Sequence, residues 1–445
     1  MASTLTRHVA AVACAVLVAT GAHAEGIPDI LTLPAAIELA RRVHPDLRVA
    51  RADLAVAHAD SQFAKAPTFN PEVEFQYSRG GSSLRAGSDG GTELGVSQEL
   101  ELWGKRGARQ SAAMARSRTS AAALSAELQQ VESQVRARFE RAIYLQERRV
   151  LLEGLADLDR RVVLATQARV RDGSITPLTG RLAELDLLRL EVQGRRARSD
   201  YRQALVALGL AIGVELSDST RLSGELHTDS LQTPEDSVIA RALRVRGEGD
   251  VLRRQVDARR AELHLARREA RPNVTVGAGL AIERQAFAGD DFSGDPAIVR
   301  GITGARDTDH LWRARVSVPL PLFQRNQAAR ARAAAEVTRS QADYDRYLLR
   351  TRLEVLGAVR RFGEAVGLYR LYLERSTRVR EDLALVREAY ADGRIALDSY
   401  LTQKGRLVDT LIGQLEAGDA YWDARGQLEA AVGLDLAQVN AGGTR

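Results

Sequence analysis

The chain has 445 residues, of which 45% are apolar and 5% aromatic, enough for one large elongated domain or for two or three ordinary ones. Charged residues make up 27%, which argues against a compact, aromatic-rich globule. The 63 basic and 58 acidic residues leave a formal charge of +5. Because they are interspersed rather than gathered into basic blocks, nucleic-acid binding is disfavoured.

Residues 1–24 have the layout of a secretory signal peptide. A basic start at Arg7 precedes an apolar run over residues 9–18 and a small-x-small cleavage site that ends at Ala24, so we predict an exported protein. The single cysteine, Cys14, lies inside the apolar run. Lipidation of Cys14 is the less favoured alternative, because it would leave too short an apolar run before the cleavage site.

The mature sequence is an internal duplication. Residues 96–106 read VSQELELWGKR and residues 316–326 read VSVPLPLFQRN. At this offset of 220, identities continue without a gap to Gly213 and Gly433. We therefore predict two repeats, residues 31–221 and 234–436, followed by a C-terminal tail, residues 437–445.

Each repeat is expected to contain the same elements in the same order. A helical stretch, at 35–66 and 236–270, ends at a break marked by proline. Alternation of apolar and polar side chains then predicts two strands per repeat. The predicted strands are 72–79, 92–101, 273–284 and 311–320. A long helix with coiled-coil spacing follows, and a glycine turn leads into a return helix. The long helices are 108–171 and 328–391, and the return helices are 177–212 and 397–432.

The expected helix lengths are mutually consistent. A helix of sixty-odd residues at 1.5 Å rise is roughly 95 Å long, and the two shorter helices of a repeat stacked end to end match it. Each repeat is therefore a helical hairpin bundle with a strand pair at one end and a glycine turn at the other. Four strands cannot close a membrane barrel by themselves. Several chains must then complete one barrel, unless the sheet only caps a soluble periplasmic rod.

Several segments resemble the TolC-like outer-membrane efflux proteins. They are HPDLRVARADLAVAHADSQFAKAPTFNPEVEF, VSQELELWGKR, VSVPLPLFQRNQAARARAAAE and the two Asp-Gly turns. The boxes QELELWGKR and PLPLFQRNQ are most similar to the cobalt–zinc–cadmium resistance branch. The resemblance implies a mainly α fold with a β-barrel portion: a homotrimer with twelve strands in the outer membrane and a long periplasmic α-barrel. It also implies two partners, a periplasmic adaptor (membrane fusion protein) and an inner-membrane RND pump.

The resemblance also assigns site residues. The two turns between long and return helices are the tips that adaptor hairpins grip. The docking residues would be Asp172, Gly173, Ile175, Asp392, Gly393 and Ile395. Tyr390, Arg394 and Asp398 fall where the family has its periplasmic gate. One Asp398 per chain would give a ring of three carboxylates that admits cations, although Asp398 could equally be a solvated carboxylate or a helix cap. Leu401 stands where the family often has a second acidic residue.

No catalytic, cofactor or metal-binding motif is found. The mature histidines are not paired at ligand spacing, so the sequence predicts no metal centre. The predicted function is an exit duct of a tripartite efflux system for divalent heavy-metal cations, located in the outer membrane with most of its mass in the periplasm. Drug efflux and type I protein secretion remain open, as does a soluble periplasmic adaptor or scaffold.

Overall fold

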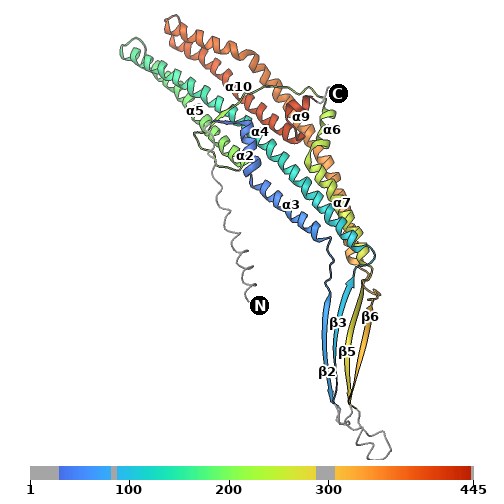
Figure 1. The fold of residues 1–445 in the computed structure, drawn as a ribbon. Helices are drawn as coiled ribbons and strands as arrows, with labels where there is room; N and C mark the ends of the chain where they lie inside the picture. Colours follow the sequence, from blue (N-terminus) through green and yellow to red (C-terminus); the bar gives the residue numbers. More distant parts are fainter. Residues whose placement is uncertain (1–29, 82–87, 287–305, 442–445) are drawn as a thin grey trace, which may run out of the picture. The chain divides into compact units, whose positions relative to one another are not determined.

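The computed structural model describes residues 30–81, 88–286 and 306–441 (Figure 1). The predicted signal peptide and most of the insertion after Ala286 lie outside these residues. The chain divides into two compact units. The helical unit comprises Met1–Arg48, Leu128–Val245 and Thr351–Arg445, and the strand unit comprises Val49–Glu127 and Arg246–Arg350.

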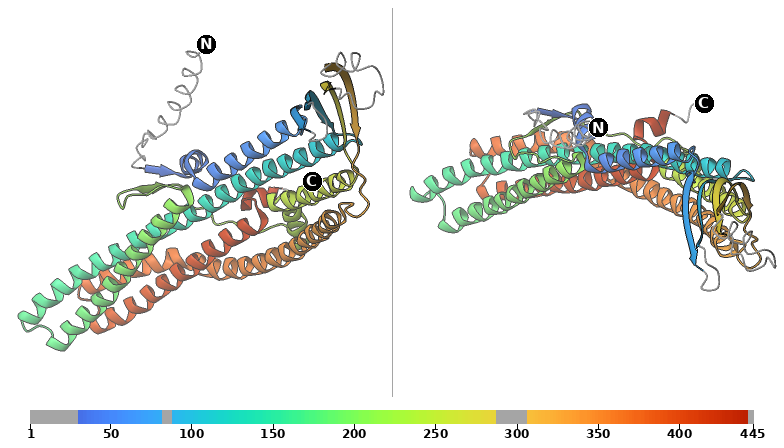
Figure 2. Two further views of the ribbon diagram at one scale, coloured as in Figure 1. Left: turned by 90° about the horizontal axis from the view of Figure 1, so that it is seen from below. Right: turned by 60° about the horizontal axis from the view of Figure 1, so that its bottom comes forward.

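The helical unit contains two antiparallel helical hairpins and their short connections. Its elements are β1 (Ile30–Thr32), α2 (Leu33–Val43), most of α4 (Lys105–Arg171), α5 (Pro177–Ile212), β4 (Arg221–Ser223), α6 (Glu235–Val245), most of α9 (Gln327–Ala391), α10 (Leu397–Val432) and α11 (Leu436–Ala441). The partners α4 and α5, and likewise α9 and α10, lie side by side in both Figure 1 and Figure 2. Arg189 on α5 forms an ion pair with Asp409 on α10, which links the two hairpins.

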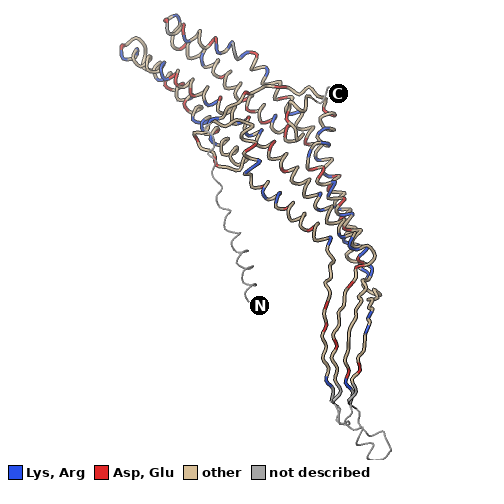
Figure 3. Tube along the Cα trace, in the orientation of Figure 1, with Lys and Arg blue, Asp and Glu red and all other residues tan. Residues whose placement is uncertain are grey.

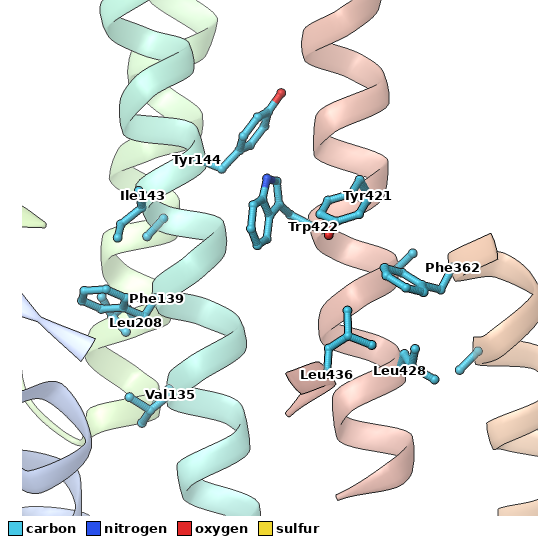
Figure 4. Close-up of a cluster of buried hydrophobic side chains, with 14 of the residues drawn as sticks. Val135, Phe139, Ile143, Tyr144, Leu208, Phe362, Tyr421, Trp422, Leu428 and Leu436 are labelled. Carbon is cyan, nitrogen blue, oxygen red and sulfur yellow. The ribbon is translucent and has the colours of Figure 1, made fainter. Parts of the chain in front are cut away.

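The core of the helical unit lies between these hairpins. Phe139 on α4 and Phe362 on α9 are fully buried, and Figure 4 shows them with Tyr421 and Trp422 of α10. The Tyr421 ring centroid lies 5.5 Å from that of Phe362, and the Trp422 ring meets Tyr421 edge-on at 5.1 Å. Aromatic pairs of this kind contribute about 0.5–1.5 kcal/mol each beyond the area they bury. The two repeats therefore share one core rather than folding as separate bundles.

The strand unit contains α3 (Pro45–Phe63), α7 (Gly247–Glu269), the first parts of α4 and α9, and four strands. The strands are β2 (Glu72–Gly81), β3 (Ser88–Leu100), β5 (Val274–Ala286) and β6 (Arg306–Ser317), joined antiparallel in the order β2-β3-β5-β6. The strand pairs of the two repeats thus form one sheet through the β3–β5 ladder. Strands β2 and β6 are therefore the two edge strands of this sheet.

One face of the sheet is apolar and uncovered by the described chain. The register aligns Phe75 with Leu94, Leu94 with Leu280, and Leu280 with Trp312 across the four strands. Since side chains alternate between faces, these four share one face. Phe75 is 67% exposed and Trp312 is 85% exposed. In a protein surrounded only by water, a continuous apolar face of this kind would be covered.

The opening helix of each repeat is broken, where the sequence predicted one continuous helix. The first break is at His44, whose backbone leaves the helical region because the following Pro45 disfavours it. The second is at Arg246, which has φ −60° and ψ 120°. Both breaks fall close to a boundary between the units.

Three further features were not predicted. The strands β1 and β4 pair in parallel as a small second sheet. The helix α11 occupies part of the expected C-terminal tail. The strands β2, β3, β5 and β6 extend farther into the glycine- and aspartate-rich connections than expected. Charged residues are interspersed along the helices, as Figure 3 shows.

Candidate functional site: the helix tips and the buried cluster behind them

Each hairpin of the helical unit turns through the same glycine motif. Gly173 and Gly393 have φ values of 71° and 72°, a left-handed conformation that favours glycine. At the first tip, Gly173 N–H donates to the Val170 carbonyl at 3.1 Å, and Ser174 N–H donates to the Arg169 carbonyl at 2.9 Å. The second tip repeats this pattern, which is the Schellman motif. The left-handed backbone of the turn is sufficient to explain why each tip has a glycine at this position.

The six predicted docking residues fall into two groups. Asp172, Gly173, Asp392 and Gly393 are exposed at the tips. Ile175 and Ile395 are half-buried and pack against a small apolar cluster that contains Tyr390, Leu397 and Tyr400. Because this cluster includes side chains from both hairpins, the two isoleucines hold the tips of one chain together. Their apolar side chains are only partly available to a partner.

The three predicted gate residues do not form one cluster. Tyr390 is 7% exposed and its ring stacks on that of Tyr400 at 4.7 Å. The Tyr390 hydroxyl lies 3.4 Å from Thr166 Oγ1 on the other hairpin. In contrast, Arg394 is exposed and pairs with Asp392 at 2.7 Å. Asp398 is also exposed, in the first turn of α10, where a carboxylate interacts favourably with the helix dipole.

Behind the tyrosine stack lies a buried charge cluster that the sequence analysis missed. Lys404 Nζ on α10 donates to Asp159 Oδ1 on α4 at 2.5 Å and also pairs with Asp186 on α5. The side chains of Lys404 and Asp159 are 4% and 6% exposed. Burial raises the pKa of Asp159, and the Lys404 ammonium partly offsets this. The ammonium also lies 5.7 Å from the Tyr400 ring. One lysine thus joins three helices from both hairpins.

The sequence contains a signal that could have revealed Lys404. It is one of only three lysines in a chain that otherwise uses arginine. It also lies on the apolar stripe of its helix, four residues from Tyr400 and four from Val408, both buried. A lysine on a buried stripe requires a carboxylate partner. Asp159 and Asp186, by contrast, are not distinguishable by sequence from the many exposed acidic residues.

A second buried charge cluster lies farther along the same helices. Arg425 Nε on α10 is 3.1 Å from Glu429 Oε1 and 3.4 Å from Glu140 Oε2 on α4. Glu429 Oε1 also accepts the Leu436 N–H at the start of α11. Burial, together with the neighbouring Glu429 carboxylate, raises the pKa of Glu140 to about 7. Two carboxylates therefore share one guanidinium in the interior.

Replacement of Tyr390 should separate the contribution of its ring from that of its hydroxyl. Tyr390→Phe should change the local opening free energy of residues 386–401 by less than about 1 kcal/mol, because a 3.4 Å hydroxyl contact is weak. Tyr390→Ala should lower it by about 3 kcal/mol, because the stacked ring is lost. Amide hydrogen exchange measures both. Equal effects of the two variants would show that the hydroxyl, not the ring, holds the tips.

Within the part of the chain that the structure describes, no three His, Cys, Asp or Glu residues come together as a metal site. Among the same residues, no helix is long and apolar enough to cross a bilayer.

The chain is similar to a known protein family and to a known resistance protein. Residues 36–214 and 250–434 each match the model of one family, described as outer membrane efflux protein. The cobalt-zinc-cadmium resistance protein CzcC of Cupriavidus metallidurans is 25% identical over 315 residues, which are 71% of this chain and 68% of that protein.

Solved structures share the fold at low identity. The CmeC outer membrane channel of Campylobacter jejuni has a TM-score of 0.67 at 16% identity, covering 90% of this chain and 85% of that one. The open state of the MtrE outer membrane channel of Neisseria gonorrhoeae has a TM-score of 0.63 at 17% identity, covering 91% and 89%.

The double match defines an outer-membrane efflux protein rather than an enzyme. The chain belongs to the outer membrane efflux protein family, whose model it matches over most of its length. The resemblance stated from the sequence and the predicted fold class are thereby confirmed.

Proposed function

We propose that this chain forms a homotrimeric exit duct of a tripartite efflux system and that its cargo is a divalent heavy-metal cation. Its partners are a periplasmic adaptor and an inner-membrane RND pump, with the adaptor gripping the tips at Gly173 and Gly393. The observation that carries the proposal is the four-stranded sheet, which has one apolar face and two edges that no other described residue covers or pairs with.

The sheet supports both insertion into lipid and association of copies. Its apolar face fits the hydrocarbon of a bilayer, whereas unpaired edge groups in lipid cost several kcal/mol each. Pairing of β6 of one copy with β2 of the next removes both edges. Three copies contribute twelve strands, which is sufficient for a closed membrane barrel.

The helical unit independently supports association. Among the described residues, α5 exposes a stripe of large apolar side chains at coiled-coil spacing. The stripe comprises Leu178, Leu182, Leu185, Leu188 and Val192. A second set on α9 comprises Leu353, Leu368, Leu371 and Leu385, whereas no large apolar side chain of α10 is exposed. A contact between α5 of one copy and α9 of the next is head-to-tail, and such a contact gives a ring when the rotation between successive copies closes.

The metal cargo is supported by the relative named for cobalt, zinc and cadmium resistance. The exposed Asp398 in the first turn of α10 is consistent with it, since three such carboxylates in a ring attract cations. The proposal predicts that loss of the protein sensitises its host to a divalent heavy metal, and that the wild-type gene restores tolerance. Unchanged tolerance to zinc, cobalt and cadmium, with increased sensitivity to a drug, would assign a different cargo.

Association is tested by disrupting the stripe on α5. Leu185→Glu should convert the detergent-extracted trimer to monomer, as measured by light scattering, because a charge replaces an apolar contact between copies. The control is Thr402→Glu at an exposed position on α10, which should leave the trimer intact. A wild-type protein that is released by osmotic shock as a monomer would refute the duct.

A further inference from the structure

The polar face of the four-stranded sheet carries an uneven set of charges. Side chains at odd positions of β3, β5 and β6, and at even positions of β2, share this face. Among its described side chains, carboxylates outnumber guanidinium groups by six to two. The carboxylates belong to Glu72, Glu74, Glu93, Glu99, Glu283 and Asp309, and the guanidinium groups belong to Arg313 and Arg315.

Arg313 links three strands across this face. Its Nη1 on β6 donates to Glu93 Oε2 on β3 at 2.6 Å, and its Nη2 donates to Glu283 Oε1 on β5. Arg315 Nη1 lies 3.8 Å from Glu74 Oε2 on β2. None of these side chains is deeply buried: Arg313 is 45% exposed and Arg315 is 66% exposed. The charges therefore remain accessible to ions in solution.

Glycines form the floor between these charged side chains. Gly95, Gly277 and Gly279 lie beside one another on β3 and β5, and they line a hollow of about 390 Å³ together with Glu74, Glu93, Arg313 and Arg315. A Cβ on Gly279 would lie 3.2 Å from the Leu94 carbonyl oxygen and 3.6 Å from Glu93 Oε1. The absence of side chains here lets the charged groups of the neighbouring strands lie across the sheet.

We propose that this face, centred on Glu93, Glu283 and Arg313, is a charge filter that favours cations in the strand portion of the duct. The proposal rests on the proposed function, in which the apolar face meets lipid and the polar face lines the lumen. Three copies then surround the lumen with an excess of carboxylates, and a surface of one sign raises the local concentration of oppositely charged ions.

The filter attracts cations without holding them. Hydrated divalent cations interact with carboxylate oxygens, but tight sites for borderline metals need converging imidazole or thiolate ligands. The described residues contain no group of three metal ligands. Arg313 keeps the two nearest carboxylates engaged, and this favours passage over binding. The role of Arg313 is to set the net charge of the filter.

Two opposite substitutions test the filter. The wild-type protein and its variants are incorporated into planar bilayers, and the cation-to-anion permeability ratio is obtained from the reversal potential in a KCl gradient. Glu93→Gln with Glu283→Gln should lower the ratio at least about twofold, and Arg313→Gln should raise it by a similar factor. Since all of these variants break the same ion pairs, a purely structural role would move the ratio in one direction only.

Controls separate this inference from the proposed function. Asp257→Asn removes a carboxylate from helix α7, where it pairs only with Arg260 in the structure, and should leave the ratio unchanged. If the first variants fail to assemble, Glu74→Gln and Arg315→Gln test the same prediction at a looser pair. Conducting channels with an unchanged ratio in every variant would overturn the filter alone. A wild-type protein that forms no channels would overturn the duct itself.

Discussion

Replacing Lys404 by methionine should lower the free energy of unfolding of the helical unit by about 3–5 kcal/mol, because it leaves the buried Asp159 and the half-buried Asp186 without their cation. Asp159 and Asp186 approach the Lys404 ammonium from α4 and α5. Without it they repel each other across a site from which water is largely excluded. Chemical denaturation and hydrogen exchange of the helical unit measure the loss.

Two further variants make the Lys404 result specific. Lys65→Met removes an exposed lysine whose ammonium donates to Gln62 Oε1, and it should change stability by less than about 0.5 kcal/mol. The triple variant Asp159→Asn, Asp186→Asn, Lys404→Met removes the whole set of charges, and it should recover part of the loss. If the single and triple variants are equally unstable, the damage comes from packing rather than from unpaired charge.

The stability of the helical unit should fall between pH 5 and pH 8 through Glu140. Its pKa is about 7 in the folded state, against an ordinary value of 4.5. A raised carboxyl pKa means that the folded state binds the proton more tightly than the unfolded state does. The stabilisation that protonated Glu140 gives the folded state is therefore complete below about pH 4.5. It is lost as the pH rises to about 7, and the loss is on the order of 3 kcal/mol.

The groups around Glu140 account for the direction of this effect. Arg425 and Arg136 favour the carboxylate, whereas burial and the Glu429 and Asp435 carboxylates oppose it. Glu140→Gln should flatten the dependence of the unfolding free energy on pH, giving a variant that loses less stability than the wild type from pH 5 to pH 8. Denaturant titrations at pH 5, 6, 7 and 8 provide the comparison. Parallel curves for the two proteins would contradict the assignment.

The sequence was sufficient to predict the fold class because its strongest signals are local and repeated. Strand alternation around Val73 and Val274, and the Asp-Gly turns at Gly173 and Gly393, appear in both repeats. Agreement between copies doubles the evidence for each element. The apolar face of the sheet could also be predicted, since it depends only on side-chain alternation.

The features that were missed depend on contacts between distant segments. The break at Arg246 has no proline to mark it, and the parallel pairing of β1 with β4 joins segments of only three residues each. The gate prediction for Tyr390, Arg394 and Asp398 was based on the family resemblance, and it remains a prediction. In the fold, burial against Tyr400 separates Tyr390 from the other two, which are exposed. The direction of the helix after the turn decides which of these side chains are buried, and a short sequence motif does not encode that direction.

Two ion pairs described above also bear on the origin of the duplication. Glu93 with Arg313, and Arg189 with Asp409, each join residues 220 positions apart, which is the offset between the repeats. These contacts therefore unite corresponding positions of the two copies. In a ring of identical single repeats, the same contact would place a residue beside its own counterpart, with two like charges facing each other. Because the two repeats of this chain differ at these positions, each contact joins opposite charges instead. The duplication thus lets one chain place different residues at corresponding positions of its two repeats.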